Sequence, residues 1–286
     1  MAATGTLTAG GIAVGAAVAV AQTEGEVCAG INGNVTADGD LNVTTESKVS
    51  AEALTATAGA GAIAVNAGVA LAINRLAQNT GISGASVRAL NVNVKASSDS
   101  SADSELLGVS VGGVGVALSA AVSQVNAKLD TYVKNADVSA ANVEVFSDVA
   151  STAIPRILSM AAGGVAAGGN VLLAFNETES HAHITDSIIK ATDLYVTADL
   201  AGEAISKLTA EQVGAIAAGV SVNYADMRAD NRAVVENSNV TVDHLSVVTG
   251  KGEHSSTIAV AESTTDRKST RLNSSHTTVS RMPSSA

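Results

Sequence analysis

Two histidines form the most ligand-like cluster of side chains in the sequence. His181 and His183 lie two residues apart, between Glu179 and Asp186. On a β-strand, residues i and i+2 point to the same side, so two imidazoles at this spacing can bind zinc or a similar ion. The equivalent positions of neighbouring repeats, described below, carry unrelated residues, which is typical of positions that face solvent. We therefore expect an exposed pair that binds no metal.

Ser110 is the only serine that we weigh as a nucleophile. It lies in the segment GVSVG, which begins at Gly108 and fits the G-x-S-x-G pattern of a nucleophile elbow. That chemistry requires a sharp turn from a strand into a helix, with a histidine and an acid nearby. The residues around Ser110 instead alternate as in a strand, and the equivalent residues are Gly59, Ala161 and Gln212. We assign no catalytic residue and expect no cofactor.

Composition narrows the class of protein. The net charge of −11 argues against a nucleic-acid groove, because binding to phosphates needs clustered Lys and Arg. Hydrophobic residues make up 46% of the chain but aromatic residues only 2%, which favours a regular stack of strands filled with small aliphatic side chains. The single cysteine, Cys28, excludes an intrachain disulfide framework, and we expect its side chain to be exposed.

The dominant pattern in the sequence is a repeat of 51 residues. One column contains glycine in every copy: Gly10, Gly61, Gly112, Gly163 and Gly214. Another column is always aliphatic: Ile12, Ile63, Val114, Val165 and Ile216. The pattern predicts five full repeats, over residues 10–60, 61–111, 112–162, 163–213 and 214–264, with residues 1–9 as the end of a sixth. The first repeat is one residue short before Val35 and one residue long at Asp38–Asp40, which places both changes in turns. A phase this regular predicts a solenoid or array.

Each repeat is expected to begin with a strand such as Gly61–Ile73. One parity of this segment carries large aliphatic residues, and the other carries small ones such as Ala64 and Gly68. We expect the strand to be covered on both faces, with the small parity packed against an opposing sheet. A variable polar loop, a short strand around Ile82, a turn and a second long segment are expected to follow. The fold class is therefore all-β, a β-solenoid with one large rung per repeat; two rungs per repeat and antiparallel hairpins remain alternatives.

The two ends of the chain need separate treatment. The first 22 residues lack charge, but they align with residues 52–73, which include Glu52 and Asn66, so we expect no membrane insertion. Asp266–His276, DRKSTRLNSSH, resembles the in-frame translation of a sequencing-adapter oligonucleotide. We therefore expect residues 1–265 to form a single repetitive domain and residues 266–286 to be a non-native, disordered tail.

The repeats resemble a known class of bacterial protein. The segment GGIAVGAAVAVA, followed by NVTADGDLNVTTES and a run of alternating Ala and Ser/Thr, resembles the passenger repeats of large filamentous adhesins. These are leukotoxin-like and filamentous-haemagglutinin-like surface proteins, exported by autotransporter or two-partner routes. The resemblance implies a non-enzymatic stalk and contact surface at the bacterial cell surface. It also implies a host-cell or matrix ligand as partner, with self-association as a further option.

The contact chemistry is expected to lie in variable loops such as 74–80, 124–130 and 176–181. Two alternatives to an adhesin remain open. A polysaccharide-acting β-helix enzyme would need carboxylates clustered on one face with basic residues nearby, whereas the acids here are scattered among columns. A purely structural segment of a biofilm matrix or surface layer would need no ligand at all.

Overall fold

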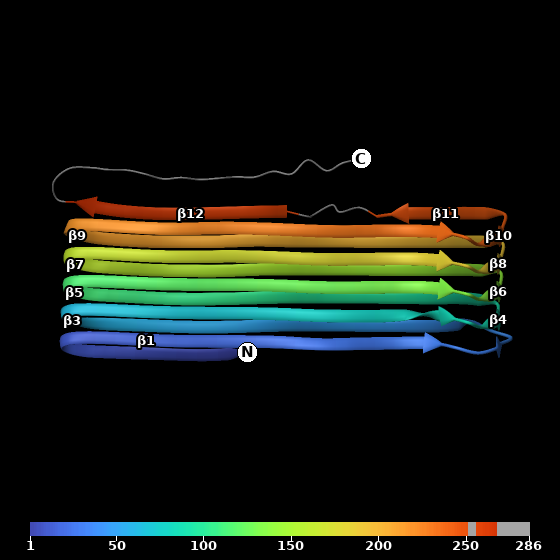
Figure 1. Ribbon diagram of the computed structural model, residues 1–286, viewed down its shortest axis with the longest axis horizontal. Coiled ribbons are helices and arrows are strands. Elements are labelled where there is room, and N and C mark those ends of the chain that lie inside the picture. Colours follow the sequence, from blue (N-terminus) through green and yellow to red (C-terminus); the bar gives the residue numbers. More distant parts are fainter. Residues whose placement is uncertain (251–255, 268–286) are drawn as a thin grey trace.

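A computed structural model describes residues 1–250 and 256–267, and these residues form parallel β-strands without a helix. Long strands and short strands alternate along the chain (Figure 1). The long strands are β1 (Ala2–Ile31), β3 (Leu41–Ser83), β5 (Asn91–Lys134), β7 (Asn142–Thr185) and β9 (Asp193–Glu236). The short strands are β2 (Val35–Thr36), β4 (Ser86–Arg88), β6 (Asp137–Ser139), β8 (Ile188–Lys190) and β10 (Asn239–Thr241). Two further strands, β11 (His244–Thr249) and β12 (Ser256–Arg267), follow β10.

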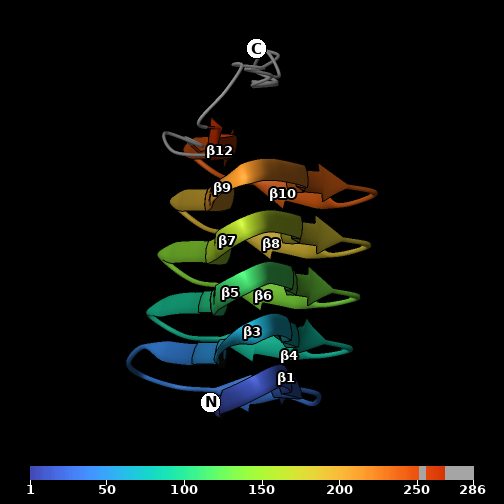
Figure 2. The same ribbon diagram turned by 90° about the vertical axis from the view of Figure 1, so that its left-hand side faces the viewer.

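Every long strand pairs in parallel with the strand one repeat further on. The order in this sheet is β1-β3-β5-β7-β9-β11, with β12 also paired to β9, and the short strands form a second sheet in the order β10-β8-β6-β4-β2. Residues pair at the spacing of the sequence repeat, as in Gly61 with Gly112 and Gly112 with Gly163. The expected β-solenoid with one rung per repeat is thus confirmed, and its rungs stack one above another (Figure 2).

The glycine column is the point at which each rung folds back on itself. The strand pairing skips one residue there, passing from Gly61 with Gly112 to Ile63 with Val114. A Cβ atom on Gly112 would lie 2.2 Å from the carbonyl oxygen of Gly61, and a Cβ on Gly163 would lie 2.1 Å from that of Gly112. No side chain fits at such distances, so the bend accepts only glycine. After the bend the chain returns alongside itself, as Figure 1 shows.

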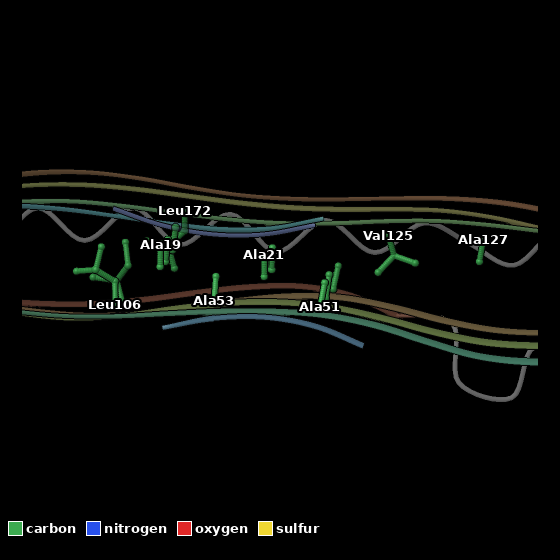
Figure 3. Close-up of a cluster of buried hydrophobic side chains, with 14 of the residues drawn as sticks. Ala19, Ala21, Ala51, Ala53, Leu106, Val125, Ala127 and Leu172 are labelled. Carbon is green, nitrogen blue, oxygen red and sulfur yellow. The ribbon is translucent and has the colours of Figure 1, made fainter. Parts of the chain in front are cut away.

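Each rung therefore has two long layers whose inner faces pack together. In β3 the first layer is residues 41–60 and the second layer is residues 63–83, and hydrogen bonds such as Thr55 Oγ1 to the carbonyl of Val69 (2.7 Å) join them. The small parity of the second layer faces inward, with Ala64 and Ala70 both fully buried. The expected packing of this parity against the opposing sheet is therefore confirmed. Figure 3 shows Leu106, Leu172 and their neighbours pointing into the space between the layers.

A second core lies at the edge of the rungs that is opposite the glycine bend. There the short strands form a third side, and larger side chains such as Ile82, Val87 and Val92 fill the interior. Between the two cores lies a buried polar stripe in which Gln78 and Thr80 both hydrogen-bond to Thr45. Because these three groups of β3 satisfy one another, they can be buried without being left unpaired.

The turn after the second layer contains a column that the sequence reasoning missed. Gly84, Asn135, Asp186 and Asn237 each have a φ between 49° and 60°. This left-handed conformation favours glycine and asparagine, and aspartate tolerates it. The column is visible in the sequence as Gly, Asn, Asp, Asn at the repeat spacing, so the signal was available.

The one-residue slip of the first repeat is confirmed by the register. Ile31 pairs with Ile82, but Val35 pairs with Val87, which shifts the pairing by one residue. The repeat spacing returns at Leu41, which pairs with Val92. The shortened turn lies between β1 and β2 and the compensating extra residue lies between β2 and β3, so both changes fall in turns.

Two expectations about the second layer are wrong. The strand is not covered on both faces, because the large parity of Gly61–Ile73 points outward and Ile63 and Val69 are exposed. The segments 74–80, 124–130 and 176–181 are also not loops, because β3, β5 and β7 continue through them. Alternation persists there with polar residues facing inward, so the backbone stays in the ladder although the sequence looks loop-like.

The tail assignment falls mostly outside the described residues. Asp266 and Arg267 end β12 and pair with Val213 and Gly214. Residues 268–286 are not described. The adapter origin of residues 266–286 and the bounds of the single domain stay predictions.

Candidate functional site

The histidine pair lies on the outer face of β7, in the part of the second layer close to the turn. His181 Nε2 lies 3.4 Å from a carboxylate oxygen of Asp230, and His183 Nε2 lies 3.4 Å from one of Asp130. The two imidazole side chains are 27% and 32% exposed, and the ring of Tyr132 meets that of His183 edge-on at 6.0 Å. Each histidine thus contacts a different acid, one on the rung above and one on the rung below.

The acids that flank the pair in the sequence do not join it in one site. Glu179 points outward and binds Lys128, and Asp186 occupies the left-handed turn position. Among the described residues, no three His, Cys, Asp or Glu side chains gather closely enough to hold a metal ion. The assignment of no metal to His181 and His183 stays a prediction.

Charged and polar side chains of adjacent rungs form a ladder around the histidines. Lys128 Nζ lies 2.6 Å from Glu179 Oε1, and Asn126 Nδ2 donates to Glu177 Oε2 at 3.1 Å. The hydrogen bond to Glu179 raises the pKa of Lys128 above its ordinary value. We call this surface the polar ladder, and its members are Glu24, Arg75, Asn126, Glu177, Arg228, Glu26, Ala77, Lys128, Glu179, Asp230, Cys28, Asn79, Asp130, His181 and Arg232. Ala77 is its one aliphatic member.

Asp230 contacts two side chains of the polar ladder, His181 and Arg232. Partial burial raises its pKa, but the hydrogen bond from Arg232, with Nε to Oδ1 at 2.7 Å, and the charges of His181 and Arg232 outweigh burial. The net pKa of Asp230 lies below its ordinary value. Arg228 forms a similar contact with Asp226 at 3.3 Å. This corner of the ladder can present both charge signs to a partner.

The outer face of the first layer carries its own acids and bases. Lys48 lies 3.0 Å from Asp99, and Lys95 lies 2.7 Å from Glu144. Further along the same face, the pKa of Asp148 is raised, first by burial and then by repulsion from the charge of Asp199. These two aspartates pair across neighbouring strands, so their like charges are held close together.

Ser110 does not have the surroundings of a nucleophile. Its side chain is fully buried, accepts a hydrogen bond from Asn66 Nδ2 at 2.7 Å and donates one to the carbonyl of Val116 at 2.7 Å. Cys28 is exposed, as expected, and its thiol donates to Glu26 Oε1 at 3.3 Å. That hydrogen bond raises the pKa of the thiol.

A wide apolar area lies on the outer face of the second layer. It occupies the part of that face between the glycine bend and the polar ladder. It includes a shallow groove in which Leu118 and Val220 stand on either side of Gly169. Leu118 is 49% exposed and Val220 is 73% exposed. The sequence reasoning missed this surface because it expected both faces of the strand to be covered. The signal was the large parity, in which the columns that begin at Ile12, Val14, Ala16, Val18 and Val20 contain no charged residue in any of the five repeats.

Comparisons with known proteins do not identify the chain. No protein-family model, no curated protein and no solved structure matches it. Within residues 1–250 and 256–267, no helix has the length and apolar character needed to cross a membrane. Function must therefore be argued from the solenoid and its two outer surfaces.

Proposed function

We propose that this chain is a non-enzymatic structural and adhesive segment of an exported bacterial surface protein, acting as a stalk and a contact surface. The observation that carries the proposal is the parallel pairing of successive repeats, which keeps one register from β3 to β9. The resemblance of the repeats to passenger segments of filamentous adhesins supports the bacterial surface as the location.

The stalk role rests on how the rungs are joined. Each rung adds about 4.8 Å to the stack. Neighbouring long strands are paired along most of their length, with interruptions at the bend and, between β7 and β9, at Ile154 and Pro155. Buried polar side chains bridge the layers as well; Asn176 Nδ2 donates to the carbonyls of Ser151 (3.1 Å) and Glu203 (3.0 Å). Such a rung resists bending, because flexing it would break many hydrogen bonds together.

The contact role rests on the polar ladder. Its outward positions are on strands rather than loops, so their spacing is fixed by the stack and only the side chains differ between repeats. Paired charges such as Lys128 with Glu179 and Arg232 with Asp230 offer hydrogen-bond donors and acceptors to a glycan or a protein surface. Such a surface can bind a partner without any enzymatic step.

Binding by the full chain tests this proposal. The chain is immobilised and probed with host cells and with an array of host and matrix glycans. We expect binding that is lost in the double variant Lys128→Ala/Arg228→Ala and kept in Lys48→Ala, which removes an exposed lysine from the other outer face. Circular dichroism of each variant checks the fold.

Other outcomes of the same experiment contradict the proposal in different ways. If the wild-type chain binds nothing, the scaffold of a biofilm matrix or surface layer replaces the adhesin. If the chain depolymerises acidic polysaccharides, measured as new reducing ends, it is an enzyme. Equal loss of binding in Lys48→Ala would place the contact surface outside the polar ladder.

A further inference from the structure

The apolar area of the second layer is continuous over five repeats. We call it the aliphatic face. It consists of five outward columns, each with one residue per repeat. The columns are Ile12, Ile63, Val114, Val165, Ile216; Val14, Val65, Val116, Ala167, Ala218; Ala16, Ala67, Leu118, Gly169, Val220; Val18, Val69, Ala120, Val171, Val222; and Val20, Leu71, Val122, Leu173, Tyr224. None of these residues is charged, and Tyr224 alone has a polar side-chain atom.

The solenoid does not need this composition in order to fold. On the same strands and the same outer face, the polar ladder carries Lys128, Glu179 and other charged residues with an unchanged register. Outward positions of this sheet therefore tolerate charge. Because large contiguous apolar surfaces are rare on monomeric soluble proteins, the aliphatic face indicates a surface that is covered.

The side chains of the aliphatic face are complementary to those of a second copy. A twofold axis that runs parallel to the strands, midway between the third and fourth repeats, places the third repeat against the partner's fourth and the second against the partner's fifth. Leu118 then faces Gly169 of the partner subunit, and Val65 faces Ala218 of the partner subunit. In the three central columns, five of the six facing pairs combine Ala or Gly with a larger side chain.

A neighbouring choice of axis loses this match. An axis through the fourth repeat would set Gly169 against the same residue of the second copy, and Leu118 against Val220 of the partner subunit. That arrangement leaves a gap between two contacts of bulky side chains. The sequence of the face therefore favours the axis between the third and fourth repeats.

The size of the overlap is also adequate for a dimer. Four facing rungs span about 19 Å and the five columns span about 30 Å, so the two copies together cover roughly 1,200 Å². Specific interfaces begin at about this total area, and the ridges of the side chains add to the flat estimate. Two sheets packed face to face are a normal core of β-proteins.

We propose that the aliphatic face is the interface of a twofold dimer of this chain. The inference goes beyond the stalk and contact roles and does not depend on them, because it concerns only the covered face.

The oligomeric state of the full chain in solution tests the proposal. Light scattering after gel filtration is expected to give twice the mass of one chain for the wild type and the mass of one chain for Val171→Asp. The matched control is Leu158→Asp, which places the same charge at an exposed leucine of the other outer face and should leave the mass doubled. A monomeric wild type overturns the proposal, as does a monomeric Leu158→Asp. A monomer that sediments with lipid vesicles assigns the aliphatic face to a lipid surface instead.

A rescue experiment tests the axis. Ala218→Leu is expected to shift the mass from dimer to monomer, because leucine would collide with Val65 of the partner subunit. Adding Val65→Ala should restore the dimer. Within one chain these positions lie three rungs apart, about 14 Å, so the rescue must act between copies. Val116→Ala in place of Val65→Ala should not restore it, and equal rescue by both would overturn the proposed axis.

Discussion

The aliphatic face and the polar ladder lie on the same strands, point to the same side and share one register, yet their chemistry is opposite. On β5 the outward residues from Val114 to Val122 are aliphatic, whereas Asn126, Lys128 and Asp130 follow at the same alternation. The backbone pairing is equal in both halves. The comparison shows that the parallel ladder accepts either chemistry at its outward positions, so the backbone pairing alone does not determine which residues lie there.

The inner faces of the two halves differ as well. Beneath the aliphatic face the inward residues of the second layer are small or polar, such as Ala64, Asn66 and Gly68, with Leu172 as the exception. A Cβ on Gly68 would lie 2.9 Å from Leu106. Beneath the turn end they are large, such as Ile82 and Val133. The two layers are thus held closely together near the bend, and a short third strand widens the interior at the other end.

The largest effect is expected at the bend, where the half with the aliphatic face begins. Gly112→Ala places a Cβ 2.2 Å from a main-chain oxygen that cannot move without disturbing the next rung. We expect a loss of about 3 kcal/mol or more in the free energy of unfolding, at the upper end of overpacking effects. Denaturant unfolding followed by circular dichroism measures it.

The control for the bend is Gly25→Ala in the polar half. A Cβ on Gly25 meets nothing within 4 Å, so the free energy of unfolding should stay the same or rise slightly. Similar unfolding curves for Gly112→Ala and the wild type would mean that the bend has more room than the close approach of Gly61 indicates.

A change of intermediate size in the free energy of unfolding is expected on the inner side of β7, and a smaller one on its outer side. Leu172 is fully buried between the layers, and Leu173 is its outward neighbour on the aliphatic face. Leu172→Ala is expected to cost about 2–5 kcal/mol, because it leaves a cavity. Leu173→Ala should cost less than about 1 kcal/mol in unfolding measured at low concentration, where copies are dissociated. Equal losses for both variants would show that the outer side is already covered in a single chain.

The sequence predicted much of this fold because its signals repeat. The glycine column, the aliphatic columns and the slip before Val35 each recur or cancel at the repeat spacing, so chance matches are easily recognised. The small parity was correctly predicted to face inward, but the large parity was wrongly expected to be covered as well. Near the bend the small residues Ala64 and Ala70 are inside and Ile63 outside, opposite to the usual rule that large aliphatic residues are buried. The polar loop expected after the first strand is wrong for a related reason, since inward polar residues such as Gln78 are satisfied across the layers.

The candidate site was predicted less completely. The column comparison placed His181 and Cys28 at the surface, where the structure also places them. The ion pairs could not be foreseen with the same assurance, because Lys128 and Glu179 come together only once the register stacks their rungs. Contacts between rungs depend only on the repeat length of 51 residues, which sets the register. Contacts between layers depend on the position of the bend as well.

The smallest effect is expected at a charged outward position, where the fold should be indifferent or even improved by a change. Asp148 has a pKa raised by burial and by Asp199, so between its unfolded value near 3.8 and its folded value the folded chain binds more protons than the unfolded chain. Stability therefore falls as pH rises through that window. Asp148→Asn removes the charge and should raise the free energy of unfolding at pH 7 by a few tenths of a kcal/mol, since the site is partly screened by solvent. The gain should disappear below pH 3.8, where the aspartate is protonated in both states.

Glu144→Gln is the matched control, because it breaks the ion pair with Lys95 and should lower stability slightly at pH 7. A loss of stability in Asp148→Asn at pH 7 would show that this carboxylate stabilises the sheet. Outward residues would then matter for folding, and the uncharged composition of the aliphatic face would no longer need a covering partner as its explanation.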